Sequence, residues 1–179
     1  MESEYLFTSQ RLGFREWQSS DLSQMAAINA DPLVMEFFPS LQSFEQTQDF
    51  IKRNQLLFSE KRFCYFAVEL LSAKKFIGFI GLSQVKFEAP FTPCVDIGWR
   101  LDSFHWGKGY ATEGALRCLE YARTVLNLKE VFSMAPVKNT KSINIMKKIG
   151  MNLNCNFIHP LLINNDFLKD CVLYSKELI

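Results

Sequence analysis

Apolar residues follow a two-residue period, or form short continuous apolar runs, in several separate segments of the chain. This pattern is typical of β-strands, in which successive side chains point to opposite faces. Residues 72–75 separate two such segments and predict a hairpin. The predicted strands cover seven segments, 11–17, 64–71, 76–87, 95–101, 131–137, 152–158 and 170–178.

Other segments carry apolar residues at helical spacing. Ser20 is a candidate N-cap for a first helix, and Ser43 with Gln46 forms a capping box for a second. Asp31-Pro32 predicts a short helical turn through Phe37. Two later helices are predicted: a long one with apolar positions from 111 to 126, and one from 139 or 140 to a terminal glycine at 150.

The order of these elements predicts one mixed α/β domain over residues 1–179. The strand at 95–101, the long helix and the strand at 131–137 would form a parallel crossover unit, and such units are right-handed. We find no internal repeat and no linker that would divide the chain.

Composition and charge narrow the function. The chain is 48% hydrophobic and 22% charged with a net charge of +1, which argues against a nucleic-acid partner bound through a strong positive field. No apolar run approaches the roughly 18 residues that span a membrane. The first four residues are acidic rather than signal-like, so we expect a soluble, cytoplasmic protein without a membrane partner.

The cysteines and histidines favour metal-free chemistry. Five cysteines occur without a C-x-x-C spacing, and the only two histidines, His105 and His159, are far apart in the sequence. We therefore expect reduced thiols and no metal site.

The stretch Trp106-Gly107-Lys108-Gly109-Tyr110-Ala111-Thr112-Glu113 lies between a predicted strand and the long helix. Free backbone N–H groups at a helix start, together with the helix dipole, favour anions such as phosphate. Glycines let a ligand approach the backbone closely. The stretch therefore predicts a phosphate or pyrophosphate site, although a glycine-rich turn that merely starts a helix explains the same residues.

Two other phosphate-binding motifs fit poorly. A Walker loop needs a glycine where this chain has Asp102. A dinucleotide-binding fingerprint needs a third glycine where Thr112 stands, and it should follow its strand at once. An oxidoreductase that uses a nicotinamide nucleotide remains one hypothesis for the function. It is tested by whether NAD stabilises the protein against thermal unfolding.

Three runs of sequence resemble the GNAT acetyltransferase superfamily, in its RimJ/RimL-like branch. They are V-D-I-G-W-R-L from residue 95, W-G-K-G-Y-A-T-E-G-A from 106 and N-T-K-S-I-N-I-M-K-K-I-G-M from 139. The resemblance implies a GNAT fold, with a mostly antiparallel seven-stranded sheet and about four flanking helices. It also implies acetyl-CoA as co-substrate, no metal, and an N-acetyltransferase activity.

The resemblance also assigns cofactor-binding positions. The superfamily's pyrophosphate loop falls on residues 106–111, where Trp106 departs from the usual Gln or Arg. The strand end at 99–101 would hydrogen-bond the pantetheine arm, and an N–H near Leu101 would polarise the thioester carbonyl. The complete implied set is Trp99, Arg100, Leu101, Trp106, Gly107, Lys108, Gly109, Tyr110, Ala111, Thr112, Asn139 and Ser142.

The catalytic residues are less clear from the sequence. Asp96 is our candidate for the base that deprotonates the amine, with Glu88 second. Ser142 could hold or protonate the thiolate. Many superfamily members place a tyrosine acid where this chain has Met146, which cannot donate a proton.

The acceptor implied by the resemblance is an amine, either a protein N-terminus, ribosomal proteins included, or a small molecule. Aromatic and late-strand residues are candidate acceptor contacts: Phe37, Phe38, Phe87, Phe91, His159 and Tyr174. The sequence does not indicate the oligomeric state. A coenzyme-A-binding module without catalysis remains the alternative function.

Overall fold

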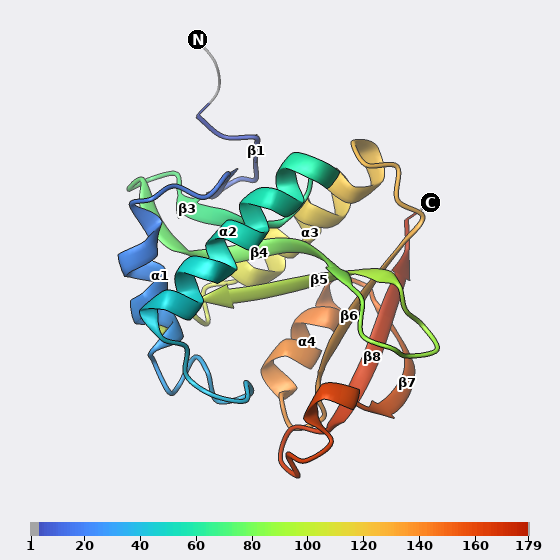
Figure 1. Ribbon diagram of the computed structural model, residues 1–179. Helices are drawn as coiled ribbons and strands as arrows, with labels where there is room; N and C mark the ends of the chain where they lie inside the picture. The colour runs from blue at the N-terminus through green and yellow to red at the C-terminus, as the bar shows by residue number, and fades with distance from the viewer. Residues whose placement is uncertain (1–3, 179) are drawn as a thin grey trace.

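A single eight-stranded sheet runs through the part of the chain that the computed structural model describes, residues 4–178 (Figure 1). Its strand order is β1-β2-β3-β4-β5-β6-β8-β7, and every neighbouring pair is antiparallel except β5 and β6. The strands are β1 (Phe7–Thr8), β2 (Leu12–Arg15), β3 (Tyr65–Leu70), β4 (Lys75–Val85), β5 (Cys94–Leu101), β6 (Glu130–Pro136), β7 (Asn152–Ile158) and β8 (Asp170–Glu177). All seven predicted strands are present, and β1 is an addition that its two-residue length hid from pattern analysis.

Four α-helices flank this sheet in the described residues: α1 (Asp21–Asn29), α2 (Phe44–Lys61), α3 (Tyr110–Thr124) and α4 (Thr140–Lys148). The capping box at Ser43 and Gln46 is confirmed, and Gly150 ends α4 with a φ of 77°. The predicted cap at Ser20 is wrong, because its side chain makes no capping bond. The predicted helical turn at 31–37 is a series of turns rather than a helix.

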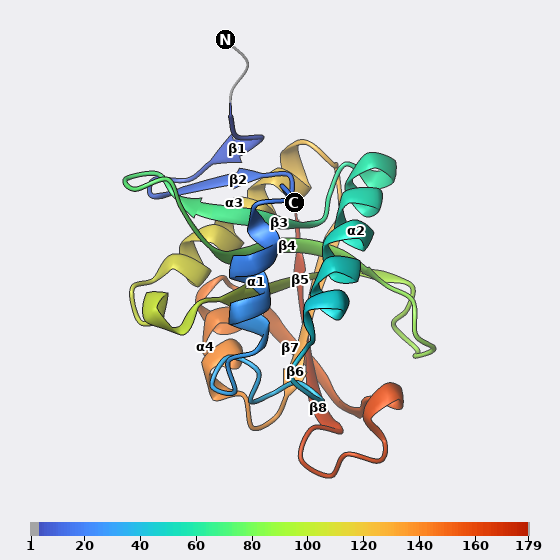
Figure 2. The same cartoon turned by 60° about the vertical axis from the view of Figure 1, so that its left-hand side comes forward.

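The helices cover opposite faces of the sheet in pairs. Alternate side chains of β3 and β4 pack in two clusters, one with α1 and the first half of α2 and the other with α3 and α4, which Phe58 near the end of α2 also joins. Figure 2 shows α1 and α2 together on one side of the sheet. The residues of β5 alternate in the same way: Asp96, Gly98 and Arg100 lie on the face of α1 and α2, while Ile97 and Trp99 lie on that of α3 and α4.

The sheet opens between β5 and β6. These two parallel strands pair only at Asp96 and Phe132 within the described residues, whereas β4 and β5 pair along eight positions. The Ser133 hydroxyl donates to the Ile97 carbonyl at 3.0 Å, just beyond that pairing. From there to the end of β5, the strand edge that faces β6 has no strand partner. The open edge positions the candidate site.

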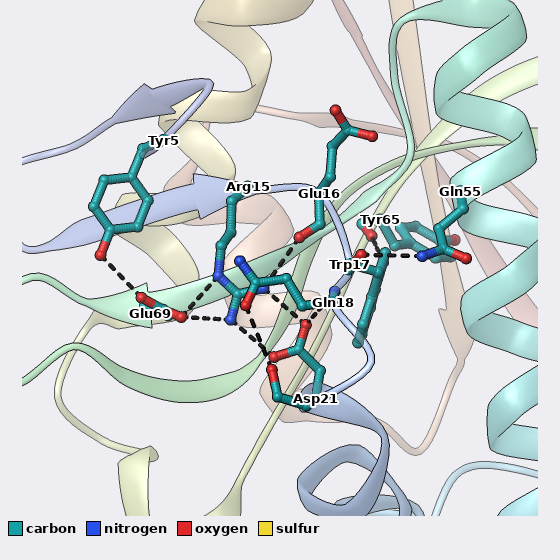
Figure 3. A network of polar contacts seen from close by, with 10 residues as sticks. Tyr5, Arg15, Glu16, Trp17, Gln18, Asp21, Gln55, Tyr65 and Glu69 are labelled. Carbon is teal, nitrogen blue, oxygen red and sulfur yellow. Dashed lines mark hydrogen bonds and ion pairs between the residues drawn. The ribbon is translucent and has the colours of Figure 1, made fainter. Parts of the chain in front are cut away.

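A buried ionic network fixes α1 to the sheet (Figure 3). Arg15 of β2 donates to both carboxylate oxygens of Asp21, in the first turn of α1, at 2.7 and 2.8 Å. It also pairs with Glu69 of β3, which accepts from Tyr5 at 2.9 Å. Carboxylates on both sides raise the pKa of Arg15 despite its burial, so the guanidinium stays charged.

Candidate active site

Two adjoining cavities lie where the sheet opens. The larger, of about 500 Å³, runs along the end of β5 and the first turns of α3 and α4. The smaller, of about 180 Å³, lies between β5 and β6. Six residues line both cavities, Phe37, Phe38, Trp99, Arg100, Asn139 and Ser142. The structure therefore provides one continuous hollow with two compartments.

The larger cavity is lined by nearly all the predicted cofactor residues. Of the set implied by the resemblance, only Lys108 is not part of its lining, and the Lys108 carbonyl accepts a hydrogen bond from Arg11. Further polar residues at its margin include Lys141 and Lys148. The structure thus brings residues from β5, α3 and α4 to one cavity.

The entrance of α3 presents backbone N–H groups rather than side chains. Gly107 and Gly109 have φ values of 72° and 82°, in the left-handed region that favours glycine. Gly109 is the N-cap, so no side chain caps the first turn. No backbone carbonyl of the described residues accepts from the N–H groups of 107–109, and the first helical N–H groups have no partner within α3. This arrangement suits a pyrophosphate.

Arg11 and Glu113 hold this entrance in place. Glu113, in the first turn of α3, accepts hydrogen bonds from the Ser9 hydroxyl at 2.7 Å and from Arg11 Nε at 2.6 Å. Burial alone would raise the pKa of Glu113, but these hydrogen bonds outweigh it and lower that pKa. The Arg11 guanidinium also donates to the Lys108 carbonyl and lies 4.5 Å from the centre of the Tyr110 ring. The segment before β2 therefore braces the loop.

Trp106 anchors the loop to the strand. Its indole Nε1 donates to the Leu101 carbonyl at 2.9 Å, and Lys141 lies 4.6 Å from its ring centre. The unusual tryptophan at the start of the loop thus has a structural role that needs no contact with a cofactor. Its position explains why a loop without the family's usual Gln or Arg keeps its shape.

The open edge of β5 carries free main-chain groups at alternate residues. Because the Ile97 carbonyl faces β6, the main-chain groups of Trp99 and Leu101 face the same way, while Arg100 pairs with Phe79 of β4. The Leu101 carbonyl already accepts from the Trp106 indole, so Leu101 offers only its N–H. The prediction that residues 99–101 offer backbone groups to a ligand therefore narrows to Trp99 and Leu101. Across the gap, Asn139 caps α4 by accepting from the Ser142 N–H at 3.1 Å.

Asp96 lies in the smaller cavity with a tyrosine beside it. The Tyr65 hydroxyl donates to the Asp96 carboxylate at 3.0 Å. Burial raises the pKa of Asp96 to about 7, although the Tyr65 hydrogen bond lowers it in part. Burial and the Asp96 charge raise the pKa of Tyr65 well above its usual value, so this hydroxyl remains a donor. A carboxylate with such a pKa can accept a proton near neutral pH.

The Arg100 side chain occupies the same face of β5. Its Nη1 donates to the Asn29 Oδ1 of α1 at 2.6 Å, and its guanidinium lies 4.0 Å from the centre of the Phe38 ring. Burial lowers the pKa of Arg100 to about 10, so the group is charged at neutral pH. Its buried Nε has no hydrogen-bond partner in the described part of the chain.

Several predicted acceptor contacts lie elsewhere. Phe37 and Phe38 line both cavities, but Phe87 and Phe91 pack with each other instead, and the Phe87 ring lies 4.6 Å from that of His159. Residues that line neither cavity include the exposed second base candidate, Glu88, and Tyr174, which is buried in the core. The loop before β5 therefore packs against the C-terminal part of the sheet and not over the site.

Sequence reasoning missed Tyr65 and Asn29. Tyr65 begins β3 and reaches Asp96 of β5 across β4. Its neighbours in register on β4 and β5 are Gly81 and Gly98, and a Cβ at Gly98 would lie 3.1 Å from the Tyr65 ring. Asn29 ends α1 and reaches Arg100 across the sheet face. Neither residue belongs to a recognisable motif, and both contacts depend on strand register. Within residues 4–178, no group of three or more His, Cys, Asp or Glu side chains could hold a metal ion.

Comparisons with known proteins establish the family. The model of the acetyltransferase (GNAT) domain matches residues 11–152. The chain belongs to the GNAT acetyltransferase family. An uncharacterized N-acetyltransferase of Bacillus subtilis, YnaD, is 30% identical to it over 95% of this chain and 89% of its own length. This relationship identifies the chain as an N-acetyltransferase.

Two solved structures of this family share the fold of the chain. RimL, a ribosomal L7/L12 alpha-N-protein acetyltransferase in complex with coenzyme A, has a TM-score of 0.79 at 16% identity, covering 98% of both chains. A spermidine N-acetyltransferase from Vibrio cholerae, in complex with CoA and spermine, has a TM-score of 0.74 at 20% identity, covering 94% of this chain and 96% of its own. The GNAT fold predicted from sequence is confirmed. In the described residues, no helix has the length and apolar character needed to cross a membrane.

Proposed function

We propose that this N-acetyltransferase binds acetyl-CoA in the larger cavity and transfers the acetyl group directly to an amine in the smaller one. The observation that carries the proposal is the α3 entrance, where uncapped N–H groups and two left-handed glycines border a cavity of about 500 Å³. A pyrophosphate is the ligand chemistry that such an entrance favours. The two solved relatives are described as complexes with coenzyme A, which supports the same choice.

The pantetheine arm would lie along the open edge of β5. Trp99 and Leu101 offer main-chain groups there, and Asn139 with Ser142 lines the opposite wall. The N–H of Leu101 is the proposed donor to the thioester oxygen. A donor fixed before the reaction stabilises the oxyanion without reorganising, which is the main electrostatic contribution in acyl transfer.

In the reaction proposed for the smaller cavity, the amine nitrogen bonds to the acetyl carbon, the carbon–sulfur bond breaks, and coenzyme A leaves as thiolate. Asp96 takes the proton that the amine loses, directly or through water, and Ser142 or water gives a proton to the thiolate. Met146, which is buried, stands where many relatives carry a tyrosine acid. A methionine has no proton to donate, so another group must protonate the thiolate.

The acceptor is an amine, and the fold alone does not select it. RimL and the spermidine enzyme share this fold, yet their names specify a protein N-terminus and a polyamine. We propose that the acceptor enters the compartment between β5 and β6, where Asp96 lies.

The test combines acetyl-CoA with a panel of peptides, amino acids and polyamines and measures free thiol. Amine-dependent thiol release with matching N-acetylated product is expected for at least one class. Binding of acetyl-CoA without turnover on any amine would overturn the transferase and favour a coenzyme-A-binding module. No binding would overturn both.

A further inference from the structure

The acceptor compartment contains a cation that lacks an anionic partner. Arg100 is 7% exposed, and no carboxylate of the described residues forms an ion pair with it. Burying an unpaired charge is costly, and structural arginines are therefore usually paired, as Arg15 is in this chain. Arg15 has two carboxylate partners, whereas Arg100 has none in the described residues, so the burial of Arg100 needs another explanation.

The contacts of Arg100 orient it without neutralising it. Asn29 accepts from Nη1 and is itself fully buried. Its amide donates to Thr47 at 2.9 Å and to Gln42 at 3.0 Å, which fixes the direction of its oxygen. Phe38 covers the guanidinium from one side. Its Nε has no hydrogen-bond partner in the described residues but is shielded from solvent, so a ligand would meet the guanidinium at its Nη atoms. A planar guanidinium held in this way can donate from those atoms to a carboxylate.

The surroundings place this cation within the acceptor site. Arg100 lines both cavities and shares its sheet face with Asp96, four residues earlier on the same strand. That spacing corresponds to roughly 13 Å between the two Cα atoms. Aromatic side chains that line the smaller cavity include Phe37, Phe38, Phe50, Tyr65 and Phe79. The compartment thus combines a proton acceptor, an apolar wall and a cation.

We infer that Arg100 binds a carboxylate of the acceptor, so that the substrate is an aminocarboxylate with an apolar body rather than a polyamine. This inference rests on the proposed function, because it assigns the specificity of the same site. A polyamine would bring a second positive charge towards Arg100, where it would be repelled.

The experiment uses the protein saturated with coenzyme A, after calorimetry has shown that coenzyme A binds. Matched pairs are then titrated: L-phenylalanine and its amide, and 6-aminohexanoate and its amide, with spermidine as the polycation. We expect at least one acid to bind about tenfold more tightly than its amide, as two good hydrogen bonds to a charge allow. Spermidine should bind more weakly than that acid.

Variants separate recognition from structural support. R100Q should bring the acid-to-amide affinity ratio close to one, R100K should restore part of it, and R53Q, which removes an exposed arginine of α2, should leave it unchanged. Taking ratios within each protein cancels the different amine pKa values of acid and amide. The wild-type ratios stand without the variants if R100Q folds poorly.

Equal affinity for acid and amide in both pairs, no binding of either acid, or tighter binding of spermidine would overturn the inference while leaving acetyl transfer intact. A ratio that R100Q does not change would also overturn it. If coenzyme A itself fails to bind, the proposed function and the inference fall together.

Discussion

Asp96 is the residue through which pH acts on the proposed reaction. Its carboxyl is protonated below about pH 7 and then cannot accept a proton from the amine. The rate should therefore rise with pH through that region. Above it, a larger share of the amine is already deprotonated, so a base contributes less.

Asp96→Asn is predicted to lower kcat/KM by about 10²-fold at neutral pH, because general bases typically contribute this much, and by less at high pH. The pH–rate profile should also lose the limb near pH 7. Glu88→Gln is the matched control, since Glu88 is exposed and lines neither cavity. A profile for Asp96→Asn that coincides with wild type would remove Asp96 from the mechanism.

Tyr65→Phe is predicted to move the same limb to higher pH. The Tyr65 hydroxyl stabilises the ionised form of Asp96, and its loss leaves burial less opposed. The measurement is the apparent pKa in kcat/KM against pH. A limb that stays in place or moves to lower pH would contradict this positioning role for Tyr65.

The sequence indicated Asp96 but neither of the residues that define its environment. An aspartate on a strand beside the glycine loop is visible from order along the chain. Tyr65 and Asn29 reach the site only through the pairing of β3 with β4 and the packing of α1 on the sheet. Such contacts between distant segments leave no local pattern in one sequence.

Among the elements, the start of α3 is the part on which the proposed binding of acetyl-CoA depends. Gly109→Trp is predicted to abolish measurable binding of acetyl-CoA in calorimetry. The indole would fill the entrance, and the left-handed φ would strain any side chain by about 1–2 kcal/mol. Wild-type affinity in this variant would contradict the loop assignment.

Gly150→Ala is the control for backbone strain. Gly150 also has a left-handed φ, at the end of α4, and does not line either cavity. This variant should lose stability without losing affinity for acetyl-CoA. If both variants weaken binding equally, strain rather than a blocked entrance explains the effect.

The elements also show where local patterns suffice. Ser43 was predicted to cap α2 and does, because Gln46 completes a box that needs only neighbouring residues. Ser20 looked equally suitable, but the Asp21 carboxylate accepts from the Gln18 N–H and binds Arg15, and the chain enters α1 without a side-chain cap at Ser20. Contacts of Asp21 with Arg15 and Gln18 therefore hold the start of α1, and the cap predicted at Ser20 does not form.

At the scale of the whole molecule, the Arg15 network joins β2, α1 and β3. Arg15→Met is predicted to reduce the free energy of unfolding by about 3–5 kcal/mol, because Asp21 and Glu69 would remain buried without their cation. Denaturant titration measures this loss. Lys74→Gln, which breaks an exposed pair with Glu4, should change stability little. Similar small effects for both variants would contradict the role given to the network.

The arrangement of the molecule was predictable because its elements follow one another in a readable order, and the motifs at 95–101, 106–115 and 139–151 fix the family. The extent of the opening between β5 and β6 was not readable from the residues. It depends on how far two parallel strands diverge after Asp96 and Phe132, and the Ser133 hydrogen bond marks where pairing ends.

The most direct test of the central claim follows the backbone amide signals of the assigned protein by NMR while acetyl-CoA is added. The account predicts that the largest shifts fall on residues 107–112, at the entrance of α3, with further shifts at Trp99 and Leu101. Saturating binding that leaves the amides of 107–112 unchanged would contradict it.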